Sequence, residues 1–240
     1  MSRLEMLRPL RDAFRGEQRR PTVILLASPV LLITWVYCGS SAFYLEHLAG
    51  SVVLWNDPAA TAGAYTFLAA FVLLGVVPAL IVKLVFGESL ADYGVGLGNR
   101  KRTVRTFLLW APVFLLVAHL ASRDPHIADY YPINKSAGKS PALFGWHACF
   151  YAMFYVGYEF HFRGFTQLGL RKSLGDVNAL LVQVLGSTLV HVGRPVGETY
   201  GAVAAGVLWG ALAYRTRSLL SGLLQHFLLG LSLDWFLCYG

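Results

Sequence analysis

Glu159 and Arg163 form a charged pair inside a strongly apolar stretch of the sequence. They are four residues apart with the acid N-terminal to the base, which is the favourable order for an ion pair on one face of a helix. In a low-dielectric surrounding, the arginine would hold the glutamate ionised and leave a base that can take a proton from water. The same spacing also fits a structural pair that joins two helices.

Two histidines could complete a site around this pair. His191 ends an apolar stretch just before the Gly-Arg-Pro break at residues 193–195, and His226 lies in the middle of the last apolar stretch. A charge at the centre of a membrane span costs about 2.5 to 3.5 kcal/mol on insertion scales, so ionisable residues there are functional candidates. With Glu159 and Arg163, the histidines could supply a base, its partner and an oxyanion donor, although either histidine alone could be structural.

Other polar residues in this half of the chain have simpler interpretations. His147 would lie about 18 Å from Glu159 on one helix, and His161 points to a different face, so both are predicted to be structural. Glu198 could join the site if the break after His191 folds inward. The expected role of Glu198 is that of an acid at the N-terminus of a helix.

A zinc site is an alternative use of the same side chains. Glu159, His191 and His226 could be three ligands, with water as the fourth. No His-Glu-x-x-His spacing supports such a site in this sequence. The sequence therefore predicts no cofactor.

Long apolar helices must position these residues. Hydrophobic residues make up 56% of the chain and charged residues 14%, whereas roughly a quarter of the residues of a soluble domain are charged. The apolar residues form blocks of about 18 to 24, the length at which a helix crosses about 30 Å of hydrocarbon. The sequence predicts an all-α, polytopic transmembrane bundle of about seven spanning helices. The expected spans are residues 21–44, 59–86, 106–121, 142–170, 174–192, 198–214 and 218–237.

The net charge of +7 is spread between the apolar blocks and forms no basic face, so no nucleic-acid partner is expected. If the N-terminus is cytoplasmic, the basic clusters at residues 100–105, 171–172 and 215–217 all lie on the cytoplasmic side, as the positive-inside rule requires. With these spans, Glu159 lies toward the cytoplasmic side and His191 toward the outer end of its helix. The two side chains would then not meet.

Three short motifs contain the candidate residues. Tyr158–Phe165 reads Tyr-Glu-Phe-His-Phe-Arg-Gly-Phe, and the other two motifs are Ser187–His191 and His226–Gly230. They resemble the motifs of the CAAX-protease and bacteriocin-processing (CPBP) family, also called the ABI family, which includes the Ras-converting CAAX endopeptidase. The family motifs are Glu-Glu-x-x-x-Arg usually continued by Gly-Phe, Phe-x-x-x-His, and His-x-x-x-Asn or Asp. The resemblance covers roughly residues 122–240.

The resemblance implies roles for four residues. Glu159 and His191 would activate a water for attack on a peptide carbonyl, and His226 would stabilise the tetrahedral oxyanion. Arg163 would orient the glutamate. No covalent intermediate is implied.

Three positions depart from the family motifs: Tyr158 replaces the first glutamate, Ser187 the phenylalanine, and Gly230 the Asn or Asp. The first departure matters most. If the family base is the first glutamate, this chain must use Glu159, whose side chain points about 100° away around the helix, or else be inactive.

The sequence therefore predicts a glutamic-type intramembrane endopeptidase that hydrolyses a peptide bond in a membrane-anchored protein or peptide. The alternative is a catalytically degenerate membrane scaffold or bacteriocin self-immunity protein. We expect a cytoplasmic basic segment at residues 1–22, N-terminal transmembrane helices at 23–121 and the CPBP-like catalytic core at 122–240. The expected location is a bacterial inner membrane, with the lipid bilayer and a membrane-anchored polypeptide as partners.

Overall fold

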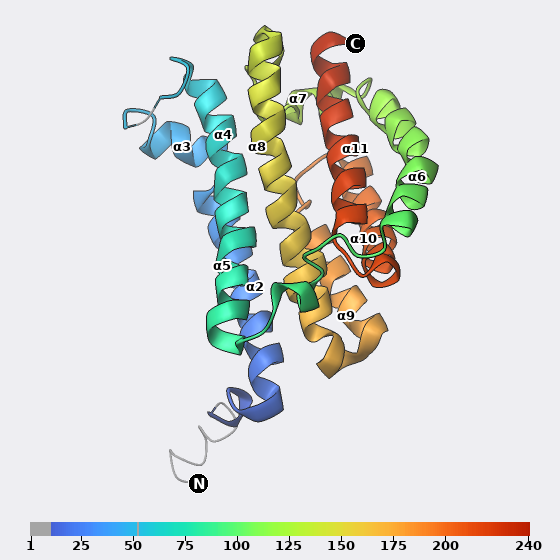
Figure 1. The fold of residues 1–240 in the computed structure, drawn as a ribbon. Helices are drawn as coiled ribbons and strands as arrows, with labels where there is room; N and C mark the ends of the chain where they lie inside the picture. The colour runs from blue at the N-terminus through green and yellow to red at the C-terminus, as the bar shows by residue number, and fades with distance from the viewer. Residues whose placement is uncertain (1–10, 52) are drawn as a thin grey trace.

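The computed structural model describes residues 11–51 and 53–240, and within these ranges every regular element is a helix (Figure 1). Residues 1–10 of the predicted basic segment lie outside the described part. The long helices are α2 (Arg19–Cys38), α4 (Pro58–Ala70), α6 (Arg100–Ala121), α8 (Pro141–Glu159), α9 (Gly169–Leu189), α10 (Val196–Thr216) and α11 (Leu220–Tyr239). Three π-helices and α5 (Val77–Leu80) continue α4 and α8: η2 (Phe71–Val76), η3 (Ile81–Phe86) and η6 (Phe160–Leu168). Short helices in the connections are η1 (Gly16–Gln18), α3 (Ser41–His47), η4 (Leu90–Tyr93), α7 (Pro125–Tyr130) and η5 (Ala137–Lys139).

Four helical segments of the described chain are long and apolar enough to cross a membrane: Gly16–Cys38, Pro58–Phe86, Arg100–Ala121 and Leu220–Tyr239. The predicted all-α membrane bundle is confirmed at this level. The predicted count of about seven spans is not confirmed, because the other three long segments carry more polar side chains. Those three segments, α8 with η6, α9 and α10, are the ones that supply most of the candidate site.

α8 is the central helix of the bundle. α4 and η2 pack along one side of it and α11 along another, while α6 packs against α11 (Figure 1). α9 packs against η6 and α10, and α10 also contacts α11. The junction of α8 with η6 is therefore surrounded by α9, α10 and α11.

Two glycines allow α8 and η2 to approach closely. A Cβ atom on Gly157 would lie 2.8 Å from the carbonyl oxygen of Ala70, and one on Gly75 would lie 3.1 Å from the Cα atom of Gly157. Small residues at such contacts let helix backbones touch inside a membrane, where van der Waals packing is a main source of association. Because Gly157 directly precedes Tyr158 and Glu159, this contact fixes the part of α8 that carries the candidate site.

The turn between the α8–η6 helix and its return helix lies at Gly175. This glycine has φ 76° and ψ 171°, so the helical path is interrupted there although α9 formally begins at Gly169. Glu159 and His191 are equally far from Gly175 along the chain, one before it and one after, and therefore come to the same level. The predicted spans 142–170 and 174–192 placed this turn too early. The prediction that Glu159 and His191 lie at different levels of the bundle was therefore wrong.

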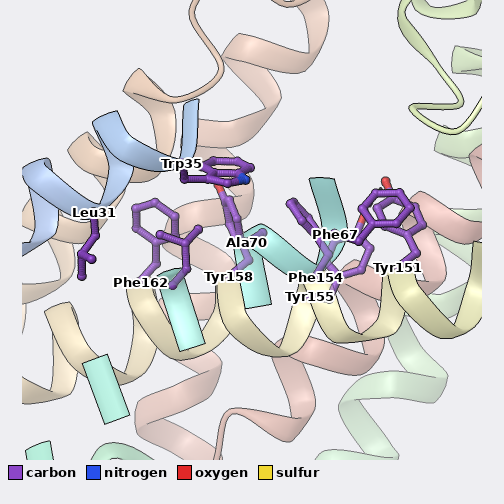
Figure 2. Packing of buried hydrophobic residues seen from close by; sticks show 10 residues of the cluster. Leu31, Trp35, Phe67, Ala70, Tyr151, Phe154, Tyr155, Tyr158 and Phe162 are labelled. Carbon is purple, nitrogen blue, oxygen red and sulfur yellow. Dashed lines mark hydrogen bonds between the residues drawn. The ribbon is translucent and has the colours of Figure 1, made fainter. Parts of the chain in front are cut away.

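The buried aromatic core lies on the side of α8 that faces α2 and α4. Trp35 of α2 packs against Phe154 and Tyr158 of α8 with ring centroids 5.9 and 6.4 Å apart. Figure 2 shows this cluster as one row of side chains along α8 and η6. Its buried members are Leu31, Trp35, Phe67, Ala70, Leu74, Tyr151, Phe154, Tyr155, Tyr158 and Phe162. Tyr155 and Tyr158 belong both to this core and to the candidate site, so the core holds one wall of the site.

Candidate active site

Glu159, Arg163 and His226 lie together at the centre of the bundle. One carboxylate oxygen of Glu159, Oε1, is 2.9 Å from Nδ1 of His226 and 3.2 Å from Nη1 of Arg163. The side chains of Glu159 and Arg163 are only 1% and 2% exposed. The ion pair predicted from the four-residue spacing is therefore present, and α11 adds a histidine to it. A buried charge pair with a further hydrogen-bond partner is the arrangement that offsets the loss of hydration.

The other carboxylate oxygen of Glu159 points toward α11. Oε2 is buried and has no hydrogen-bond partner in the described structure. A Cβ atom on Gly222, one turn before His226, would lie 2.8 Å from this oxygen. The glycine therefore leaves the space that Glu159 needs in order to reach His226.

Arg163 belongs to the π-helix η6, which begins directly after Glu159. Short π-helical segments are rare and are often found at functional sites. The guanidinium carbon of Arg163 lies 5.5 Å from the ring centroid of Trp209 and 5.9 Å from that of Tyr158. Cation–π contacts of this kind stabilise a guanidinium that is shielded from water. Arg163 is thus held by rings on two sides while it faces the carboxylate.

The ring of His226 stacks on Trp209, with centroids 4.1 Å apart and an interplanar angle of 27°. On its other side lie Tyr155 and Tyr158, at centroid distances of 4.5 and 5.4 Å. Since Nδ1 faces the carboxylate of Glu159, the neutral ring donates its proton there and Nε2 is left for another partner. The side chain of His226 is 14% exposed, so it is the accessible member of the Glu159 pair.

His191 lies across Tyr158 from His226 and does not contact Glu159. Its Nδ1 is 2.6 Å from the carbonyl oxygen of Ser187. A carbonyl can only accept, so Nδ1 carries the proton and Nε2 of the neutral ring is an acceptor. The ring centroids of His191 and Tyr158 are 6.4 Å apart. Glu159 and His191 were predicted to act together, but the structure places Glu159 against His226 and His191 against another acid.

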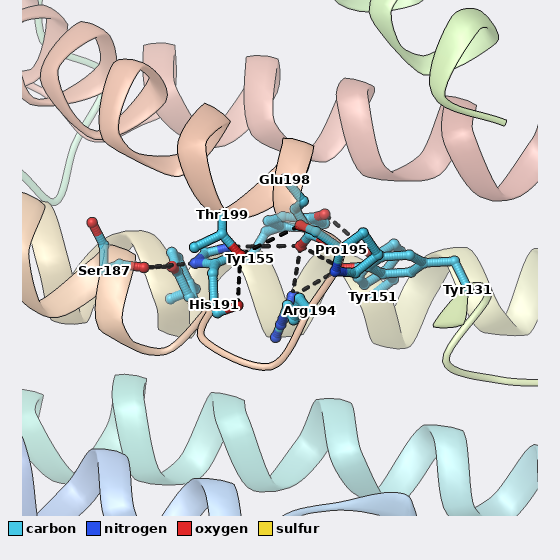
Figure 3. A network of polar contacts seen from close by, with 10 residues as sticks. Tyr131, Tyr151, Tyr155, Ser187, His191, Arg194, Pro195, Glu198 and Thr199 are labelled. Atoms are coloured by element: carbon cyan, nitrogen blue, oxygen red, sulfur yellow. Dashed lines mark hydrogen bonds and ion pairs between the residues drawn. The ribbon is translucent and has the colours of Figure 1, made fainter. Parts of the chain in front are cut away.

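That acid is Glu198, in the first turn of α10. Its Oε1 lies 3.6 Å from Nε2 of His191. The same oxygen accepts hydrogen bonds from the hydroxyl of Tyr131 at 2.7 Å and from Nη1 of Arg194 at 3.0 Å. Figure 3 shows this network, in which Thr199 also donates to the backbone oxygen of His191. Glu198 thus has the predicted place at a helix N-terminus and also lies in the site, because the break after His191 folds inward.

Gly230, which replaces the Asn or Asp of the third family motif, also has a structural explanation. A Cβ atom on Gly230 would lie 1.9 Å from the hydroxyl oxygen of Tyr155 and 2.9 Å from that of Tyr151. The hydroxyl of Tyr155 therefore fills the space that an Asn or Asp side chain would need, and it lies beside His226. Tyr155 was not among the residues predicted from the sequence, although Tyr151, Tyr155 and Glu159 follow one another at four-residue steps on one helix face.

His147 lies apart from Glu159, in an ion pair with Asp234 of α11. Its Nε2 is 2.9 Å from Oδ2 of Asp234, and both side chains are almost fully buried. His161 is buried as well, and neither of its ring nitrogens has a hydrogen-bond partner within the described ranges. In the part of the chain that the structure describes, no three His, Cys, Asp or Glu side chains are arranged to hold a metal ion.

The molecule is thus a bundle of apolar helices with ionisable groups buried at its centre, which defines it as a polytopic membrane protein with an internal polar site. Residues 139–232 match the family of type II CAAX prenyl endopeptidases described as Rce1-like. This match supports the resemblance to the CPBP family of membrane proteases that the three motifs indicated. Comparison with curated proteins and with solved structures gave no match. The matched segment contains all four predicted site residues.

Proposed function

We propose that the protein is an endopeptidase that hydrolyses a peptide bond in a membrane-anchored polypeptide, through a water activated by a carboxylate and a histidine. The observation that carries this proposal is the cluster of Glu159, Arg163 and His226, in which the charge pair is buried in an apolar bundle and the histidine side chain stays 14% exposed. Ionisable groups in such a place are unfavourable for stability and mark functional sites. We further propose a bacterial inner membrane as its location.

The reaction consists of two proton transfers around one attack. The oxygen of water forms a bond to the carbonyl carbon, one water proton passes to the base, and the carbonyl electrons move onto the oxygen. The carbon–nitrogen bond then breaks as the base returns this proton to the leaving nitrogen, which gives a new carboxyl group and a new amine. His191 supports the first step, because its Nε2 is an acceptor on a side chain that is 11% exposed.

His226 stabilises the oxyanion in this proposal. With Nε2 also protonated, the ring donates from Nε2 to the oxyanion, and the carboxylate of Glu159 balances its positive charge. Arg163 holds Glu159 in place from the opposite side. The hydroxyl of Tyr155 lies beside His226, where the family motif has Asn or Asp, and becomes a second donor when its proton turns from Tyr151 to the oxyanion.

A panel of membrane-anchored peptides, incubated with the purified protein in liposomes, tests this function. The panel contains lipidated C-terminal peptides, bacteriocin leaders and C-terminal sorting helices. We expect the wild type to cleave at least one of them, and Glu159→Gln and His191→Ala to lose that cleavage. Cleavage is expected to be unaffected by a metal chelator.

The degenerate scaffold makes the opposite prediction. If Tyr158 and Gly230 mark a lost activity, the folded wild type cleaves no peptide of the panel, including peptides encoded beside its own gene. Loss of cleavage with chelator would instead contradict a reaction carried by the carboxylates and histidines alone.

A further inference from the structure

The position of the missing motif glutamate leaves His191 without a carboxylate from α8. Tyr158 stands at this position, and its ring lies between His191 and His226. Glu159 does not fill the gap, because one of its oxygens is bound by His226 and Arg163 and the other faces Gly222. The carboxylate that lies against His191 comes from α10, with Oε1 of Glu198 3.6 Å from Nε2.

We propose that Glu198 is the general base of this site and that it acts with His191 on the attacking water. This inference rests on the proposed peptidase function and assigns a new residue to it. Glu159 then becomes a positioning residue that holds His226. The site has two carboxylate–histidine pairs on either side of Tyr158, one for the water and one for the oxyanion.

Neither of the two facing atoms of the His191–Glu198 pair carries a proton when the ring is neutral and the carboxyl group is ionised. Since Nδ1 of His191 donates to the carbonyl of Ser187, the neutral ring presents an acceptor at Nε2. An ionised carboxylate is also only an acceptor, so the two atoms cannot bond directly without a proton between them. A water that donates one proton to Nε2 of His191 and the other to the unpartnered oxygen of Glu198, Oε2, satisfies both groups. Its oxygen lone pairs then remain free to attack a carbonyl carbon.

The hydrogen bonds of Glu198 fix one of its carboxylate oxygens and leave the other without a partner. Tyr131 and Arg194 both donate to Oε1, which holds the carboxylate in one orientation. The other oxygen, Oε2, is buried and has no partner in the described structure. A buried carboxylate oxygen without a donor is unfavourable, and in a native site it requires an explanation such as a water or a catalytic role. Arg194 places a positive charge 3.0 Å from the other oxygen of this carboxyl group.

In the resulting mechanism, Glu198 takes a proton from the water while the water oxygen bonds to the carbonyl carbon. Glu198 later gives this proton to the nitrogen of the leaving amine when the carbon–nitrogen bond breaks. His191 accepts the second hydrogen bond of the water and orients it. No oxidant, metal or further reactant is needed for this balance.

Isosteric substitution tests the role of Glu198 in liposomes with a cleaved, anchored peptide. Glu198→Gln keeps an acceptor for Tyr131 and Arg194 but cannot take the proton, so kcat is expected to fall by about 10²- to 10⁴-fold. Its thermal midpoint in detergent is expected to stay close to that of the wild type. Asp176→Asn, on the exposed turn after α8 and η6, is the matched control and should leave kcat unchanged.

A transfer of the carboxylate back to α8 gives the more specific test. Adding Tyr158→Glu to Glu198→Gln places a carboxylate between the two histidines and is expected to restore kcat at least about tenfold. Adding Tyr158→Gln to Glu198→Gln should leave kcat as low as in Glu198→Gln alone. Failure of Tyr158→Glu to restore kcat in a folded double variant would contradict the proposed role.

The other possible results separate the role of Glu198 from the peptidase function. If Glu198→Gln keeps full kcat while Glu159→Gln and His226→Ala lose it, the peptidase function stands and the role of Glu198 is wrong. If the wild type cleaves nothing, both are wrong. Should Glu198→Gln not fold, Glu198→Asp decides, because it keeps the charge opposite Arg194 but withdraws the carboxylate from the water; full kcat in this variant would contradict the proposal.

Discussion

At the residue scale, Tyr155 illustrates how a neighbouring helix can supply a group that a motif lacks. Its hydroxyl occupies the space next to Gly230, and its ring lies 4.5 Å from that of His226. The same hydroxyl donates to that of Tyr151 at 2.9 Å, which holds it in place. When its proton turns from Tyr151 to the oxyanion, this hydroxyl is expected to stabilise the transition state more than the bound substrate.

We predict that Tyr155→Phe lowers kcat by about 10²- to 10³-fold, the usual effect of removing one oxyanion donor. KM should change little, because the ring and its packing remain. Steady-state cleavage of an anchored peptide in liposomes measures both constants. Tyr239→Phe at the end of α11 is the control. A kcat close to that of the wild type would show that Tyr155 has no part in the reaction.

Gly222 gives a second prediction at this scale. In Gly222→Ala the new Cβ would lie 2.8 Å from Oε2 of Glu159 and 3.4 Å from Cβ of Trp209. The carboxylate must then move away from His226, so kcat is expected to fall at least about tenfold. Gly201→Ala on α10, where a Cβ meets no atom within 4 Å, is the matched control. Equal activity of the two variants would mean that the position of Glu159 does not matter.

At the scale of elements, α8 and α11 are joined by two buried polar contacts. One is the Glu159–His226 pair of the site, and the other is the His147–Asp234 pair at the far end of α8. The second pair contacts no proposed catalytic group and holds the two helices in register. It also explains why His147, predicted to be structural, lies in an apolar helix.

We expect His147→Ala to lower the free energy of unfolding by about 1 to 3 kcal/mol, because it leaves the carboxyl group of Asp234 buried without its hydrogen-bond partner. Equilibrium unfolding in mixed detergent micelles measures this change. The double variant His147→Leu with Asp234→Leu removes both polar groups and is expected to recover most of the loss. A double variant as unstable as His147→Ala would contradict this account of the pair.

The connection that leads into α4 carries a pH-dependent contact. Lys139 donates to Asp57 at 2.8 Å, and this hydrogen bond lowers the pKa of Asp57 from its usual 3.8 to about 2. Because the folded pKa is the lower one, the contact stabilises the fold above about pH 4 and loses its effect as the pH falls through 2. Lys139→Met should therefore lower the thermal midpoint at pH 6 but not at pH 2. An equal difference at both pH values would contradict the assignment.

At the scale of the whole molecule, the sequence predicts the helices and one half of the site. Apolar block length indicates the membrane helices, and the four-residue spacing correctly pairs Glu159 with Arg163. Both features depend only on residues that are close together in the chain, so they can be recognised in a single sequence. The motifs also bring His226 and His191 into one region of the bundle, where the structure places them on either side of Tyr158.

The partners across helices could not be predicted in this way. They depend on where the chain turns at Gly175 and on how closely Gly157 and Gly75 bring two backbones together. A shift of one turn in a helix boundary is enough to separate Glu159 from the level of His191. For the same reason, the contact of Glu198 with His191 appears only once the break between α9 and α10 is seen to fold inward.

Cleavage of one anchored peptide in liposomes made in H₂¹⁸O, analysed by mass spectrometry, tests the central claim most directly. We predict that the wild type produces two fragments, of which the N-terminal one carries ¹⁸O in its new C-terminal carboxyl group, and that Glu159→Gln, Glu198→Gln and His226→Ala each produce far less of both. Intact peptide after incubation with the folded wild type would contradict the account. Cleavage by all three variants at the level of the wild type would contradict it as well.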